Sequence, residues 1–441
     1  MNFFKELGNF MMLGARAHAQ WEIDVSKRIV GSRKRMFILG LLCLPILFLG
    51  IAFAEEVAGV APSFIGGKEA YSPAFYTPTI FFASIGVGLC AGLITGCIGA
   101  GGGFIIAPAL MSAGVKGILA VGTDLFHIFA KAIMGSVLHR KLGNISVPLA
   151  AVFLIGSIAG ATLGGWINRT IYEANPVMSD AFITTIYVFM LGFLAFYALM
   201  DFFKTLKASK SGAAASGGGH GKKDAGTMTI LARSLQKVNL PPMIHFDQHL
   251  VPGGRQISWL FLVLSGAFVG LAAAIMGVGG GFLTFPIFVY VLGVSSATTV
   301  GTDIFQIIFT AGYAGLGQYA IYGFIFYTLA MGMLLGSLIG IQLGSLVTKV
   351  VSGQTICGFY AVAVSAGFTN RVFALPSKLA SLGYIQMSTE TGDMLKNIGT
   401  YLFFVVISIF ALWVIWTFLI NIKTLKGIDT TSDAHVKEAH A

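Results

Sequence analysis

Charged residues are scarce in this sequence. Asp, Glu, Lys and Arg make up 10% of the 441 residues, whereas a soluble domain carries about 25%. Hydrophobic residues make up 56%, and the mean hydropathy is +0.83. Most of the surface must therefore face lipid, which argues against a soluble enzyme and predicts an integral membrane protein.

The sequence also lacks the groupings that carry redox, metal or nucleophilic chemistry. Its four cysteines lie singly in apolar stretches without a C-x-x-C pair, so we interpret them as packing residues. The segment HFDQH (245–249) has too few ligands for a metal site and is expected to be a polar loop. No nucleophile–base pair and no ATP-binding motif stands out. We therefore predict no enzymatic activity and no cofactor.

The net charge of +10 is distributed as in a membrane protein. Lys and Arg cluster beside apolar stretches, as in KRIVGSRKR (27–35) and KTLKASK (204–210). This distribution is typical of the cytoplasmic flanks of membrane spans. We predict no nucleic-acid partner.

Apolar segments account for most of the chain. Residues 36–54 end in Ala-Phe-Ala and are either a retained span, which we favour, or a cleaved signal peptide. Further apolar segments lie at 79–113, 117–138, 146–168, 180–203, 258–292, 297–318, 324–348, 354–372 and 399–422. The segments 79–113 and 258–292 are too long for one crossing of the membrane and contain glycine clusters. We predict an all-α polytopic transmembrane bundle with about eight spans and two re-entrant or broken glycine-rich segments.

Five regions are expected along the chain. They are a cytoplasmic amphipathic segment (1–35), a first membrane half (36–203), a cytoplasmic flexible loop (204–257), a second membrane half (258–422) and a cytoplasmic tail (423–441).

The two halves repeat one another. Three blocks align in the same order: GAGGGFIIAP (99–108) with GVGGGFLTFP (277–286), GVKGILAVGTDLFHI (114–128) with GVSSATTVGTDIFQI (293–307), and GSIAGATLGG (156–165) with GSLIGIQLGS (336–345). Three matched blocks in register indicate an internal duplication.

Each glycine cluster predicts a break in a membrane helix. Gly101, Gly102 and Gly103 in the first repeat, and Gly279, Gly280 and Gly281 in the second, are poor helix formers. Irregular backbone at membrane depth is tolerated only where protein buries it or where it lines a cavity. Freed N–H groups at such a break suit an anion. The alternative is close helix–helix packing through small residues.

The distribution of basic residues predicts the topology. With the N-terminus inside and both glycine segments re-entrant, 21 Lys and Arg residues are cytoplasmic and six are outside, Arg371 among the six. The two repeats then enter the membrane from opposite sides, as inverted repeats, with the substrate expected where they meet.

A polar stripe marks one helix of the first repeat. Asp124, His127 and Lys131 share one face of the 117–138 helix, and the matching positions of the second repeat are Asp303, Gln306 and Thr310. We expect His127 and Lys131 to attract an anion, and Asp124 and Asp303 either to cap helix ends or to take part in proton coupling.

The doubled motif G-x-G-G-G-F-[IL]-x-x-P, followed by G-T-D-[LI]-F, resembles the TauE/SafE family of sulfite exporters over about residues 77–422. The resemblance implies a polytopic transporter of small sulfur-containing anions such as sulfite, sulfate or organosulfonates. It also adds Thr123 and Thr302 to the substrate-binding glycines. The long 204–257 loop and the Asp at 124 and 303 depart from the commonest pattern of the family.

We therefore predict a secondary transporter, an exporter or permease, in the inner membrane with both termini cytoplasmic. Its expected partners are a small anionic substrate, the lipid bilayer and a coupling proton or cation. The alternatives are a passive anion channel and a membrane accessory subunit that binds a soluble partner through the 204–257 loop.

Overall fold

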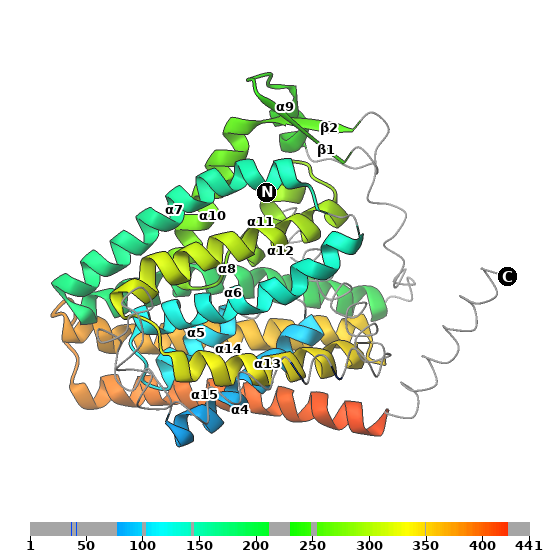
Figure 1. Ribbon diagram of the computed structural model, residues 1–441. Coiled ribbons are helices and arrows are strands. Elements are labelled where there is room, and N and C mark those ends of the chain that lie inside the picture. The colour runs from blue at the N-terminus through cyan, green and yellow to red at the C-terminus, as the bar shows by residue number, and fades with distance from the viewer. Residues whose placement is uncertain are drawn as a thin grey trace.

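The computed structural model describes residues 77–98, 103–142, 145–210, 230–247, 254–348 and 350–421, together with Phe37 and Leu41. These residues form a bundle of long helices, with a small helix and a two-stranded hairpin at one edge (Figure 1). The predictions for 1–35, for most of 36–54 and for the 423–441 tail concern residues outside these ranges.

The helices follow the predicted segments closely. The first half contains α4 (Pro78–Ile98), α5 (Gly103–Ser112), α6 (Gly117–Leu142), α7 (Val147–Ala174) and α8 (Pro176–Lys210). Between the halves lie α9 (Ile230–Lys237), β1 (Met243–Phe246) and β2 (Arg255–Ser258). The second half contains α10 (Trp259–Met276), α11 (Gly281–Pro286), the π-helical η3 (Ile287–Val291), α12 (Ser296–Gly312), the π-helical η4 (Tyr313–Tyr319), η5 (Ala320–Tyr322), α13 (Tyr327–Val347), α14 (Gly353–Ser381) and α15 (Thr389–Ile420).

Within the described part of the chain, six helices are long and apolar enough to cross a membrane: α4, α7, α8, α10, α13 and α15. The remaining long helices, α6, α12 and α14, carry the buried ionisable residues Asp124 and His127, Asp303, and Arg371 respectively. The prediction of an all-α polytopic membrane protein is confirmed.

The two halves are interleaved, because the first helix of each repeat packs along a later helix of the other. Helix α4 lies along α13, and glycines set their close approach. A Cβ added to Gly88 would lie 2.2 Å from the carbonyl oxygen of Met333, and one added to Gly96 would lie 2.4 Å from that of Ile341. Residue numbers rise together along this contact, so α4 and α13 are parallel.

Helix α7 makes the equivalent contact with α10. A Cβ on Gly156 would lie 1.9 Å from the carbonyl oxygen of Val263, and one on Gly160 would lie 2.0 Å from that of Ala267. This is the small-xxx-small packing of membrane helices. These glycines, which lie outside the two glycine clusters, serve close packing.

Equivalent helices of the two repeats run in opposite directions where they meet. Helices α6 and α12 pack together, and the chain is antiparallel there: Gly315 lies against Leu125, and Gly312 lies against Phe129. Because α6 and α12 occupy the same place in the two repeats, an antiparallel contact requires that the repeats be inverted. The inverted-repeat prediction is thereby confirmed.

The segment between the halves contains an ordered element. Strands β1 and β2 pair antiparallel, with Met243 opposite Ser258. Asp247, which follows β1, is buried and has a left-handed backbone (φ 57°). Its carboxylate accepts hydrogen bonds from the backbone N–H of Ser295 (2.8 Å), the hydroxyl of Ser295 (2.7 Å) and the hydroxyl of Thr298.

Ser295 is the N-cap residue of α12, so Asp247 fastens the hairpin to the start of that helix. Two further side chains hold the loop that precedes α12: Arg255 Nη1 donates to the carbonyl of Gly293, and Gln236 Nε2 donates to that of Leu292, both at 2.8 Å. We call Asp247, Arg255 and Gln236 the hairpin clamp. Of the predicted 204–257 loop, residues 204–210 continue α8, while α9, β1 and β2 are held against the second repeat.

Candidate functional site

The second glycine cluster is a true helix break. Helix α10 ends at Gly277 in the left-handed region (φ 79°), and Gly279 and Gly280 have φ values of 67° and 87°. Helix α11 begins at Gly281. Residues with a Cβ rarely adopt these angles, so the sequence ends the membrane helix here.

The first cluster has the same placement. Helix α4 ends at Ile98 and α5 begins at Gly103, while Gly101 and Gly102 lie outside the described residues. Both glycine-rich segments therefore separate a long helix from a short one, as predicted.

The two breaks meet beside α6. A Cβ on Gly103 would lie 2.9 Å from the Cα of Val278, and one on Gly279 would lie 2.7 Å from Cγ2 of Ile128. Ile128 therefore lies at the contact between the two repeats, and His127 is its neighbour in the sequence. Because these backbones touch, the polar residues of α6 lie next to the junction of the two broken segments.

The first repeat contributes buried ionisable groups to this junction. Asp124 is fully buried and His127 is 2% exposed. His127 Nδ1 lies 3.6 Å from an Asp124 carboxylate oxygen, and its Nε2 is 2.9 Å from the hydroxyl of Ser337 on α13. Lys131 is half-buried one turn further along and interacts electrostatically with both Asp124 and His127.

This cluster is incompletely satisfied. Among the described residues, no hydrogen-bond partner of strict geometry is found for the carboxylate oxygens of Asp124 or for His127 Nδ1, although the backbone of Ala107 on α5 lies close enough to stabilise the carboxylate. Unsatisfied buried polar atoms are rare and costly in folded proteins and call for an explanation such as a bound ion, a water or a functional role.

The second repeat builds a different, fully connected network. Gln306 Nε2 donates to Asp303 (2.9 Å), and the Gln306 carbonyl oxygen accepts from Thr310 (2.7 Å). The Thr310 hydroxyl is 2.8 Å from that of Ser157 on α7. A Cβ on Gly281 would lie 3.3 Å from Asp303 Oδ2, so this carboxylate lies beside the first residue of α11. The two polar clusters are thus related by the repeat but differ in charge.

The two motif threonines connect the repeats. Thr123 accepts a hydrogen bond from the backbone N–H of Phe326 (2.9 Å), and Thr302 accepts one from Ser146 (3.0 Å). Phe326 and Ser146 are the N-cap residues of α13 and α7. Each threonine of one repeat therefore holds the start of a helix in the other.

Sequence reasoning missed three polar residues. Ser157 and Ser337 occupy the same position of the third repeat block, which signalled their importance. Arg371, which the count of basic residues places outside, is 1% exposed within α14. Its position in the apolar 354–372 stretch was the available signal for a buried arginine.

Inverted repeats with broken helices and buried ionisable groups at their junction define a class: the polytopic membrane transporters. The comparison with known families then gives the particular group. The family model described as "Sulfite exporter TauE/SafE" matches residues 84–370, and the chain belongs to this family.

Similar proteins of known sequence are also described as membrane transporters or as members of this family. The chain is 25% identical to the probable membrane transporter protein YjnA of Bacillus subtilis over 264 residues, which is 59% of this chain and 87% of the relative. It is 24% identical to the probable membrane transporter protein YunE of the same species, over 63% of this chain and 91% of the relative. It is also 32% identical to Sulfite exporter TauE/SafE family protein 6 of Arabidopsis thaliana, over 24% of this chain and 27% of the relative. No solved structure matches the chain.

Proposed function

We propose that this protein is a secondary transporter of small sulfur-containing anions such as sulfite, sulfate or organosulfonates, and that the anion binds at the junction of the two broken segments. One observation carries the proposal: His127 and the half-buried Lys131 lie on α6, whose Ile128 meets both Gly103 and Gly279. Ionisable groups at membrane depth are usually functional. These two would attract an anionic substrate to the freed backbone of the broken segments.

The difference between the repeats supports a division of labour. The first repeat offers His127 and Lys131, whereas the equivalent positions of the second hold neutral Gln306 and Thr310 around Asp303. A carboxylate in a neutral hydrogen-bonded network can take up a proton or a small cation. Asp303 is therefore the coupling residue in this proposal, and the first repeat supplies the anion ligands.

The proposed setting is the inner membrane with both termini in the cytoplasm. The excess of Lys and Arg in the segments assigned to the cytoplasm supports it. The inverted relation of α6 and α12 agrees with the re-entrant arrangement used in that assignment.

Flux into proteoliposomes tests the transport function. Purified protein is reconstituted, and uptake of labelled sulfite, sulfate and sulfoacetate is measured with and without an imposed proton gradient. Saturable uptake that accumulates against a concentration gradient supports a secondary transporter. Saturable flux that only equilibrates indicates a passive anion channel, and no flux of any of the three refutes the proposed substrate class.

Lys131→Ala tests the site itself. The protein should remain folded but lose flux, because the substitution removes a cation one helical turn from Ile128, which meets both broken segments. Lys131→Arg is the matched control, since it keeps the charge and should retain part of the flux. Unchanged transport by the alanine variant would remove Lys131 from the site.

A further inference from the structure

A second, strongly basic cavity lies at one end of the bundle, outside the junction of the glycine segments. Its volume is about 260 Å³, and it lies where the α5–α6 loop, the start of α8, the C-terminal part of α14 and α15 come together. Its charged lining residues are Lys116, Asp180, Arg371, Lys378 and Lys396. Four cations thus face one carboxylate.

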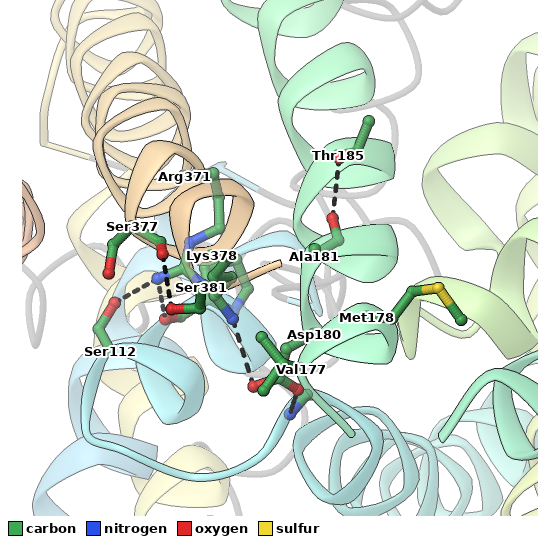
Figure 2. A network of polar contacts seen from close by, with 12 residues as sticks. Ser112, Val177, Met178, Asp180, Ala181, Thr185, Arg371, Ser377, Lys378 and Ser381 are labelled. Carbon is green, nitrogen blue, oxygen red and sulfur yellow. Dashed lines mark hydrogen bonds and ion pairs between the residues drawn. The ribbon is translucent and has the colours of Figure 1, made fainter. Parts of the chain in front are cut away.

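The single carboxylate is already engaged. One oxygen of Asp180 accepts the backbone N–H of Gly117 at 2.7 Å, at the start of α6. The other lies 3.3 Å from the ammonium of Lys378 (Figure 2). Asp180 therefore pairs with Lys378, bonds the start of α6, and also stabilises the charge of Arg371 electrostatically. The lining as a whole still carries more positive than negative charge.

Arg371 is the most buried of these cations, at 1% exposure. Its guanidinium donates to the side-chain oxygen of Asn370, to the hydroxyl of Ser112 and, at 3.2 Å, to the carbonyl of Pro108. All three acceptors are uncharged, and among the described residues no carboxylate forms an ion pair with Arg371. A buried cation held only by neutral groups costs free energy that a bound anion would recover.

The cavity also contains polar groups suited to an oxyanion. Ser112 and Ser377 line it together with Arg371. Figure 2 shows Ser112 bonded to the guanidinium, and the Ser112 hydroxyl donates in turn to Asn370. The bonds to Asn370, Ser112 and Pro108 use Nε and Nη2 of Arg371, so Nη1 is the guanidinium nitrogen that can donate a charge-assisted hydrogen bond to a sulfonate or sulfate oxygen. Since one water takes about 30 Å³ of liquid, the cavity has room for an oxyanion with a short carbon chain.

The cavity is connected to the junction of the broken segments by helix α5. Ser112 and Pro108 belong to α5, whose first residue is Gly103 at the junction of the broken segments. Ten helical residues span about 15 Å, so α5 runs from the junction to the cavity. Arg371 thereby contacts both the cavity and the arm that carries the first glycine segment.

We infer that this cavity is a second anion site, an outer vestibule in which Arg371, with Lys116 and Lys396 at its rim, binds a sulfonate- or sulfate-sized oxyanion before or after it occupies the junction. The inference rests on the proposed function for the identity of the anion. The binding chemistry rests on the cavity alone.

Binding to the purified full-length protein in detergent tests it. The probes are labelled sulfate and sulfoacetate, measured at constant ionic strength with chloride as the replacing anion. Lys396→Gln should weaken binding about threefold to tenfold, and Arg371→Lys at least about tenfold, because a lysine ammonium cannot both keep the bonds to Asn370 and Ser112 and place a donor where Nη1 stands. In flux assays the same variants should raise KM and leave kcat within about twofold.

Two controls separate this inference from the proposed function. Lys131→Ala should lose flux but keep sulfate binding at the vestibule. Glu390→Gln, a change at an exposed position on the same helix as Lys396, should alter neither flux nor sulfate binding. Wild-type affinity in both Lys396→Gln and Arg371→Lys, or no probe binding to the wild type, overturns the vestibule even if transport is observed. Intact vestibule binding without any flux overturns the proposed function and leaves the vestibule standing.

Discussion

The hairpin clamp offers a prediction that depends on no assumed substrate. Asp247 accepts hydrogen bonds from the backbone and hydroxyl of Ser295 and from the hydroxyl of Thr298, at the start of α12. Asp247→Gly removes the carboxylate without straining the backbone, because glycine readily adopts the left-handed angle of 57° found there. Asp247→Asn also tolerates this angle and keeps one acceptor oxygen.

The magnitude follows from these bonds. A hydrogen bond to a charged group contributes about 1.5–3 kcal/mol, and water can replace part of it because Ser295 is only half-buried. We expect Asp247→Gly to cost about 3–5 kcal/mol and Asp247→Asn about 1–2 kcal/mol. For a chain of 441 residues the glycine variant should melt about 3–5 °C earlier.

The assay combines thermal unfolding of purified protein with hydrogen exchange. Exchange should rise in β1, β2 and the first turn of α12, while α4 and α13 stay protected. Asp393→Asn, an exposed acidic position on α15, is the control and should leave both measurements unchanged. A glycine variant that melts within about 1 °C of the wild type, with unaltered exchange, would refute the clamp.

Three further changes have defined outcomes. His127→Gln installs the residue found at the equivalent position of the second repeat; glutamine keeps a hydrogen-bonding group but cannot become a cation. The KM for transport should rise about tenfold, with thermal stability nearly unchanged. An unaltered KM would count against an anion-binding imidazole. Gly160→Val should cost about 3 kcal/mol or more, since its Cβ position lies 2.0 Å from a backbone oxygen of α10, whereas Gly86→Val, with nothing within 4 Å, should purify and melt like the wild type. Thr302→Val should lower the free energy of unfolding by about 1–2 kcal/mol because it leaves the N–H of Ser146 without its acceptor, which a thermal melt beside the wild type will measure.

Much of the architecture could be predicted because its causes are local. Scarce charge and long apolar runs require a membrane, and glycine clusters interrupt helices wherever they occur. The in-register duplication and the basic-residue distribution together predicted inverted repeats, which the antiparallel contact of α6 with α12 confirms.

Residue types alone could not show which groups meet. The burial of Arg371 was not predicted, because a count of basic residues only assigns each one to a side of the membrane. It does not anticipate an arginine that is buried beside Ser112, more than 250 positions away. The buried role of Asp247 was missed for the same reason, since its partners lie at the start of α12.

The sequence by itself determined that this chain is a duplicated helical membrane protein with interrupted helices, because hydropathy, glycine content and repeat register act over short stretches of chain. Only the tertiary structure decided that α4 packs along α13 and α7 along α10, that His127 contacts Ser337 in the other repeat, and that four cations and one carboxylate line one cavity. These arrangements depend on which helix surfaces fit closely together, and helix packing is a property of pairs of helices rather than of either one alone.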